Sequence, residues 1–167
     1  MEIVVHLQDE NANRKNTGRN GGHKEYIFKV ILIGDGSVGK TSLIRRYMEG
    51  KFKTDYLPTI GSQVYTKKLL GKDETKITLV VWDISGQPAF TAVRPEYYKG
   101  AVAILLVYDL TRPETFQHLG GWLSETKRYS SNPEIILIAN KSDLEGNRKI
   151  DPRLGEQYAS KINAPYL

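Results

Sequence analysis

The chain has 167 residues, of which 40% are hydrophobic and 26% charged, and this composition suits one globular domain with a buried core. Its formal net charge of +5 is too small to indicate a nucleic-acid-binding protein, and the absence of cysteine excludes disulfides and thiolate metal sites. No run of about 18 apolar residues occurs and the N-terminus lacks a signal-peptide pattern, so we expect a soluble chain.

The first 24 residues are predicted to form a flexible extension, because residues 9–24 are polar, contain glycine and show no periodicity. Over residues 25–167 apolar runs alternate with amphipathic stretches, which predicts one α/β domain. The apolar runs are rich in β-branched residues and nearly continuous, as is typical of parallel strands covered on both faces. They are residues 26–33, 76–84, 101–110 and 134–140.

The remaining elements complete this prediction. Residues 62–70 are predicted to pair antiparallel with residues 76–84 across a tight turn. Two helical faces are predicted, one from Leu43, Tyr47 and Met48 and one from Phe116, Leu119 and Leu123. Thr111 is expected to cap a helix, with Glu114 reaching back to it. Asp151 is expected to cap another. The predicted sheet is therefore mostly parallel, with one antiparallel strand.

The sequence GDGSVGKT at residues 34–41 follows the first predicted strand and matches the phosphate-loop pattern G-x-x-x-x-G-K-[ST]. Glycine lets backbone N–H groups approach a polyphosphate and turn inward around it. Lys40 is expected to reach the β- and γ-phosphates, and the Thr41 hydroxyl to ligate Mg²⁺. The residues expected to contact nucleotide here are Gly34, Gly36, Ser37, Val38, Gly39, Lys40, Thr41 and Ser42. A plain glycine turn is the alternative, and the strand before and the helix after the motif argue against it.

Two further motifs stand at predicted strand ends. Asp83 ends the second long apolar run, where a carboxylate can hold Mg²⁺, although such a residue can also be a simple loop cap. NKSD at residues 140–143 follows the last run. Asn140 and Lys141 are expected to brace the nucleotide pocket, and the Asp143 carboxylate to accept the guanine N1–H and exocyclic amine, a donor pair that adenine lacks. We expect three neighbouring strand ends to converge on one magnesium-bound guanosine polyphosphate.

The motifs GDGSVGKT, YLPTIG, WDISGQ and NKSD occur in the order found in the Ras superfamily of small GTPases, which the chain resembles from Tyr26 to its last residue. Trp82 before Asp83, and the stretch YYKGAVAILLVYDLTRPETF, are most similar to Rab proteins. The resemblance implies a P-loop NTPase fold with three α/β/α layers and a six-stranded sheet. It also implies a Rab-like molecular switch that binds Mg²⁺ with GTP or GDP, hydrolyses GTP slowly to GDP and phosphate, and acts in vesicle trafficking or signalling.

Further site residues follow from the resemblance alone. Thr59 matches the switch threonine that ligates Mg²⁺ and senses the γ-phosphate, and Gln87 matches the glutamine that orients the attacking water. Gly86 matches the glycine whose N–H meets the γ-phosphate, and Phe52 the aromatic residue that packs on guanine. The implied catalytic residues are Gln87, Lys40 and Thr59, and the implied magnesium ligands are Thr41, Thr59 and Asp83. No arginine is identifiable as a catalytic finger, so unaided hydrolysis is expected to be slow.

The resemblance also implies protein partners, namely an exchange factor, a GTPase activator and effectors, at residues 53–61 and 84–98. Trp82 and Tyr97 match two aromatic residues through which Rab effectors read the switch, whereas Val64 stands where phenylalanine is usual. It implies a cytoplasmic protein that reaches membranes peripherally through a C-terminal tail in a full-length form, and no nucleic-acid partner.

The sequence departs from the family pattern in three places. Ser85 replaces the usual alanine and Pro88 the usual glutamate around Gln87, so hydrolysis at or below the family norm is expected. The sequence ends at NAPYL, where the family's last strand begins, so we expect residues 25–167 to be a C-terminally incomplete domain. A nucleotide-binding scaffold with little turnover is the main alternative to a GTPase. An ATP-using phosphotransferase is a third reading, which Asp143 disfavours.

Overall fold

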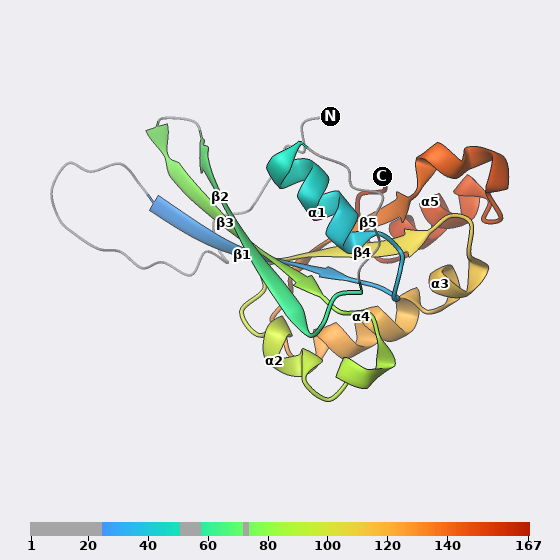
Figure 1. Cartoon of the computed structure of the whole chain (residues 1–167), viewed down its shortest axis with the longest axis horizontal. Helices are drawn as coiled ribbons and strands as arrows, with labels where there is room; N and C mark the ends of the chain where they lie inside the picture. Colours follow the sequence, from blue (N-terminus) through green and yellow to red (C-terminus); the bar gives the residue numbers. More distant parts are fainter. Residues whose placement is uncertain (1–24, 51–57, 72–73) are drawn as a thin grey trace, which may run out of the picture.

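The computed structural model describes residues 25–50, 58–71 and 74–167, which form one mixed sheet between helices (Figure 1). The strands are β1 (Glu25–Ile33), β2 (Ser62–Leu70), β3 (Lys76–Ile84), β4 (Ala103–Asp109) and β5 (Glu134–Asn140). The helices are α1 (Lys40–Glu49), α2 (Arg94–Tyr98), α3 (Pro113–Gln117), α4 (Leu119–Lys127) and α5 (Pro152–Lys161), with short 3₁₀ helices η3 (Pro88–Phe90) and η4 (Ser142–Asn147). The extension predicted at residues 1–24 and the predicted guanine-packing residue Phe52 lie outside the described residues, so both stay predictions.

The sheet confirms the predicted fold class. Its strand order is β2-β3-β1-β4-β5, with β1, β3, β4 and β5 parallel and β2 antiparallel to β3. The strands predicted at 76–84 and 134–140 have the observed bounds, whereas the one predicted at 101–110 is shorter. Among the described residues the sheet has five strands. Tyr166 adds a parallel bridge to Leu137, so the end of the chain lies beside β5.

Alternating side chains of β1 face two separate cores, because successive residues of a strand point to opposite faces. Ile31 and Ile33 belong to the larger core, which also contains residues of α2, α4 and α5. Leu32 belongs to the smaller core, where Ile44 of α1 packs. Figure 1 shows α1 on one side of the sheet and α2 and α4 on the other. Each fully buried aliphatic side chain stabilises this three-layer arrangement by about 1.5–3 kcal/mol.

The predicted buried face of α1 is wrong at one position. Tyr47 is 47% exposed, and Ile44, at 4% exposure, is the α1 residue that enters the core. The physical reason is the neighbouring hairpin, since the Lys67 ammonium of β2 lies 3.8 Å from the centroid of the Tyr47 ring and makes a cation–π contact with it. The partner of this ring is therefore a cation on the surface and not the sheet core.

The two predicted helix caps differ in outcome. Asp151 caps α5 as predicted, since its Oδ1 accepts the backbone N–H of Arg153 at 2.9 Å. Thr111 caps no helix, because its hydroxyl donates to Asp109 Oδ1 at 2.7 Å, and the N-cap residue of α3 is Arg112 without a side-chain cap bond. None of the helices in the described part of the chain is long and apolar enough to pass through a bilayer.

The parallel strands end at one edge of the sheet, which is where open α/β folds bind ligands. β3 is the neighbour of β1, so Asp83 lies beside the loop that follows β1, as expected. β5, which precedes NKSD, is not their neighbour, because β4 lies between β1 and β5. The expectation of three adjacent strand ends is therefore wrong. β4 adds a fourth strand end to this edge, and its last residue is Asp109.

Candidate nucleotide-binding site

The phosphate loop joins β1 to α1 in a conformation that side chains would obstruct. Gly34 has a φ of 136°, and a Cβ added there would lie 2.1 Å from the carbonyl oxygen of Val107 in β4. Gly39 has a φ of 96°, and a Cβ there would lie 2.3 Å from the side-chain nitrogen of Asn140. Ser37 also has a positive φ, of 63°, which costs an L-residue roughly 1–2 kcal/mol. Packing against β4 and β5 thus requires both end glycines of the motif.

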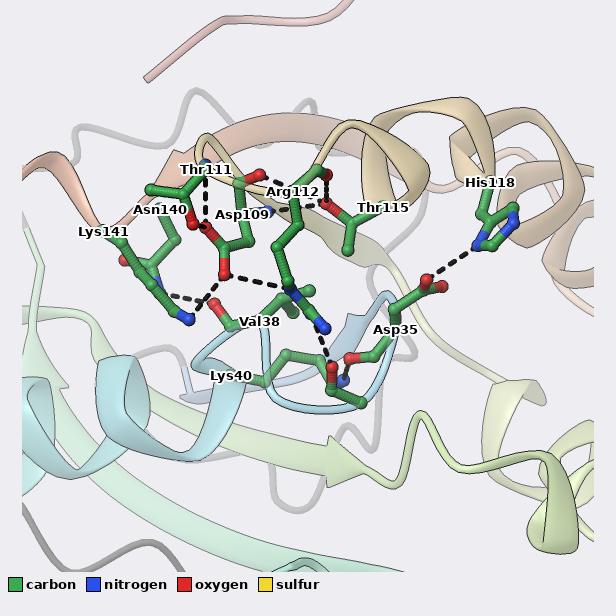
Figure 2. Close-up of polar contacts among 11 residues, drawn as sticks. Asp35, Val38, Lys40, Asp109, Thr111, Arg112, Thr115, His118, Asn140 and Lys141 are labelled. Atoms are coloured by element: carbon green, nitrogen blue, oxygen red, sulfur yellow. Dashed lines mark hydrogen bonds and ion pairs between the residues drawn. The ribbon is translucent and has the colours of Figure 1, made fainter. Parts of the chain in front are cut away.

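Lys40 begins α1, and its side chain turns back to the loop and is buried. Its Nζ donates a hydrogen bond to the carbonyl oxygen of Gly34 at 2.6 Å. It donates another to the carbonyl oxygen of Asp35 at 2.7 Å (Figure 2). Burial lowers the pKa of Lys40 to about 8, and the carboxylates of Asp83 and Asp35 oppose this shift. Both direct partners are carbonyl oxygens and not carboxylates. The ammonium is therefore suited to bind an added anion such as a phosphate.

Thr41, Thr59 and Asp83 form a cluster of oxygen atoms beside Lys40. Thr41 Oγ1 lies 2.8 Å from Thr59 Oγ1 and donates to Asp83 Oδ2 at 2.5 Å. Thr59 Oγ1 lies 3.4 Å from the same Oδ2. Burial raises the pKa of Asp83, while the Thr41 hydrogen bond and the Lys40 charge oppose that shift. Asp83 Oδ1 is buried and has no hydrogen-bond partner among the described residues.

Residues 85–87 lie against the phosphate loop. A Cβ added to Gly86 would lie 2.3 Å from the Gly34 carbonyl oxygen and 2.5 Å from the Gly36 nitrogen, so only glycine fits without movement. The Cγ of Gln87 lies 4.0 Å from a Cβ added to Gly36. Ser85 is buried, and its Oγ accepts the Gln87 N–H at 3.4 Å. The structure thus brings Gly86 and Gln87 beside the loop.

The NKSD motif contributes two residues that the structure ties to this site. Asn140 donates from Nδ2 to the carbonyl oxygen of Val38 at 2.7 Å. Lys141 has a positive φ of 69°, and its Nζ lies 2.5 Å from Asp109 Oδ2. Asp143 is exposed in η4, and the hydrogen bonds among the described residues include none from Asp143 to the loop. The predicted base-recognising carboxylate therefore lies at the same edge but outside the hydrogen-bonded network.

Asp109 and Arg112 belong to the site and escaped the sequence reasoning. The buried carboxylate of Asp109 accepts hydrogen bonds from Thr111 and pairs with Lys141 and Arg112 (Figure 2). Arg112 Nη2 also donates to the carbonyl oxygen of Gly36 at 2.8 Å. Asp109 was detectable in principle, because it ends an apolar run just as Asp83 does. Nothing in the sequence marks Arg112, and the sequence identified no arginine as a catalytic finger.

The side chain of Asp35 ties the other flank of the loop to α4. Its Oδ1 accepts the Trp122 Nε1–H at 2.7 Å, and its Oδ2 lies 2.7 Å from His118 Nδ1. The Arg94 guanidinium of α2 lies 4.4 Å from the centroid of the Trp122 ring and is paired with Glu125. Elements α2 and α4 therefore support the loop from the side opposite α1.

A mostly parallel sheet with a glycine-rich loop, a buried lysine and a threonine–aspartate oxygen cluster at its carboxyl edge defines a P-loop nucleotide-binding protein. Among the described residues no group of three His, Cys, Asp or Glu side chains could hold a metal.

Comparison with known proteins narrows the class. The family model described as the Ras family matches residues 29–167. The chain is 41% identical over 151 residues to Ras-related protein RABA4b of Arabidopsis thaliana, covering 90% of this chain and 67% of the relative. It is 42% identical over 144 residues to RABA4a, and 38% identical over 144 residues to RABD2a, both of the same plant. These alignments cover 86% of this chain, and 63% and 70% of the two relatives.

The chain belongs to the Ras family and is a Rab-like small GTPase of the Ras superfamily. Membership of this GTP-binding family agrees with the site. The chain spans about two thirds of the length of the relatives it matches, between 63% and 70% for these three.

Proposed function

We propose that this chain binds GTP with Mg²⁺ and hydrolyses the γ-phosphate slowly, alternating between GTP-bound and GDP-bound states as a molecular switch. The observation that supports this most is the convergence of the buried Lys40 ammonium with the Thr41, Thr59 and Asp83 oxygens beside the phosphate loop. Gln87 lies next to the same loop, where a water attacking the γ-phosphate would need to be oriented.

The residues present fit a magnesium ion. Asp83 Oδ1 is a buried acceptor without a hydrogen-bond partner among the described residues, and burying such a group costs about 1–3 kcal/mol unless it is compensated. Thr41 and Thr59 place hydroxyl oxygens next to the other carboxylate oxygen. Oxygen donors of this kind suit Mg²⁺, which binds few protein groups and keeps several waters. When bound, the ion supplies positive charge that stabilises the β- and γ-phosphate oxygens.

The mechanism assigns one role to each residue. The water oxygen bonds to the γ-phosphorus as the bond from that phosphorus to the β–γ bridging oxygen breaks, releasing GDP and phosphate. Gln87 and the Thr59 carbonyl orient the water. Lys40 and the loop N–H groups stabilise the negative charge that develops on the bridging and γ-oxygens. Gln87 and Gly36 are neighbours, since a Cβ added to Gly36 would lie in ordinary van der Waals contact with the Gln87 side chain.

Turnover is proposed to be slow, and one contact favours a scaffold as the second candidate. Ser85 Oγ accepts the Gln87 N–H at 3.4 Å, and Pro88 begins η3 directly after Gln87. Both features restrain the backbone of the residue that must orient water. If this restraint holds Gln87 away from the γ-phosphate, the protein would retain GTP without hydrolysing it.

Specificity and partners complete the proposal. The Asp143 carboxylate is proposed to select guanine, and Phe52 to pack on the base. Effectors and regulators are proposed to contact residues 53–61 and 84–98 together with the adjacent aromatic pair. In that pair the ring centroids of Trp82 and Tyr97 lie 5.8 Å apart, and Val64, the cross-strand partner of Trp82, is 49% exposed. The proposed cellular role is vesicle trafficking or signalling, as the resemblance to Rab proteins implies.

The test is a single-turnover assay of the purified chain loaded with GTP or ATP in the presence and absence of Mg²⁺. Phosphate release from GTP that needs Mg²⁺ and falls in Gln87→Leu supports the GTPase. Retention of GTP without release in either protein supports the scaffold instead. Preference for ATP would contradict the proposed guanine specificity, and absence of binding to either nucleotide would contradict the function as a whole.

A further inference from the structure

Arg112 belongs to none of the sequence motifs, and its side chain lies between the end of β4 and the phosphate loop (Figure 2). Its guanidinium spans two groups, donating from Nε to Asp109 Oδ2 at 3.2 Å and from Nη2 to the Gly36 carbonyl oxygen at 2.8 Å. Its backbone is held as well, since its N–H donates to the Asp109 carbonyl oxygen and its carbonyl accepts the Thr115 N–H, both at 3.0 Å. Both ends of this side chain are therefore fixed.

The anchor of Arg112 is itself immobile. The Asp109 side chain is fully buried, and its Oδ1 accepts the Thr111 N–H at 2.9 Å and the Thr111 hydroxyl at 2.7 Å. Its Oδ2 is shared by Arg112 and by Lys141 of the NKSD motif. Although burial by itself raises the pKa of Asp109, the hydrogen bonds from Lys141 and Thr111 hold it below its usual value. One ionised carboxylate thus joins the base-recognising motif to the arginine.

The position of the contact on the loop decides what Arg112 does. A trans peptide is planar, and its C=O and N–H point in opposite directions. Arg112 holds the carbonyl oxygen of Gly36, so the N–H of the same peptide, which belongs to Ser37, is directed away from Arg112. Ser37 has a φ of 63°, which a residue with a side chain adopts only when its surroundings enforce it. The guanidinium is one group that enforces this peptide orientation.

We propose that Arg112 is a positioning residue, which holds the peptide between Gly36 and Ser37 so that the Ser37 N–H faces the polyphosphate of the nucleotide. The inference rests on the proposed nucleotide binding and adds a residue to it. The planar fork of arginine suits this task, because it bonds the carboxylate and the carbonyl at once. Lysine carries a single ammonium nitrogen in place of this fork, so it lacks two donor nitrogens at separate positions.

The experiment compares three variants of the full chain. Arg112→Met removes the donors and keeps the stem, Arg112→Lys keeps the charge beside Asp109, and Arg153→Met is the matched control. Arg153 suits this purpose because it lies on α5 with its side chain 84% exposed. Two quantities are measured, namely the dissociation constant for GDP and the ³¹P NMR spectrum of bound GDP. We expect Arg112→Met to weaken GDP binding about tenfold, as loss of a hydrogen bond from a charged donor does.

Arg112→Lys is expected to weaken binding by a similar factor, and both Arg112 variants to shift the phosphate resonances. Arg153→Met is expected to match the original chain in both measurements. If Arg112→Met does not fold, Arg112→Lys decides, because Asp109 keeps a cationic partner in that variant. Unchanged affinity, or weaker binding with unchanged ³¹P resonances, would overturn the inference. If the original chain gave no bound-GDP resonances, the proposed nucleotide binding would be wrong. The inference about Arg112, which rests on that binding, would then be wrong as well.

Discussion

Raising the pH from about 7 to about 9 should weaken nucleotide binding through one residue, Lys40, whose pKa burial lowers to about 8. In the nucleotide-free protein about nine tenths of the Lys40 side chains are protonated one unit below this pKa, and about one tenth one unit above it. A bound polyphosphate holds the protonated form, so binding takes up a proton in this range. The affinity for nucleotide therefore falls as the pH rises, by about tenfold between about pH 7 and about pH 9.

The assay is a GDP titration at several pH values, with calorimetry in two buffers of different ionisation enthalpy to count the protons taken up. Lys40→Arg should flatten the pH profile, because a guanidinium stays charged throughout this range. Lys29→Arg, the matched control, should retain the slope of the original chain, because Lys29 donates to the Lys99 carbonyl away from the loop. A flat profile in the original chain, or the absence of proton uptake near pH 8, would refute the reasoning.

Three further predictions concern a loop contact, base recognition and a helix cap. Gly86→Ala should slow single-turnover hydrolysis by at least tenfold, since a Cβ there meets loop backbone at 2.3 Å and overpacking costs about 1–3 kcal/mol. Gly86→Ala should also lower the unfolding temperature of the nucleotide-free protein. Gly36→Ala should leave that temperature unchanged, because a Cβ there has its nearest neighbour at 4.0 Å, and equal destabilisation by both variants would contradict this. Asp143→Ala should reduce the ratio of the affinity for GTP to the affinity for ITP, which lacks the exocyclic amine. An unchanged ratio would count against Asp143 as the residue that recognises the base. Asp151→Ala should lower the free energy of unfolding by about 1 kcal/mol in urea, and no loss would mean that the cap bond is dispensable.

The strands and the phosphate loop were predictable because their signals are local. A parallel strand covered on both faces is nearly continuously apolar, so the runs at 76–84 and 134–140 appear in the sequence with the bounds that they have in the structure. The glycine pattern of the loop is equally local, because φ angles of 136° and 96° exclude most side chains at Gly34 and Gly39. The Asp151 cap was readable for the same reason, since its partner is two residues away.

Thr111 shows where local reasoning failed. The sequence TRPE has the pattern of a capping box, yet the Thr111 hydroxyl bonds the buried carboxylate of Asp109. The hydroxyl bonds this carboxylate and not a helix N–H, because a hydrogen bond to a charged group contributes about 1.5–3 kcal/mol, whereas a helix cap typically contributes about 1 kcal/mol.

By itself, the sequence determined the class of fold and the loop that suits a polyphosphate, because each of these depends on residues close together in the chain. Only the tertiary structure decided which side chains hold that loop in place. Arg112 is 76 positions from Gly36, and Trp122 is 87 positions from Asp35. Such contacts depend on the order of strands in the sheet, which places β4 between β1 and β5, and no local pattern records that order.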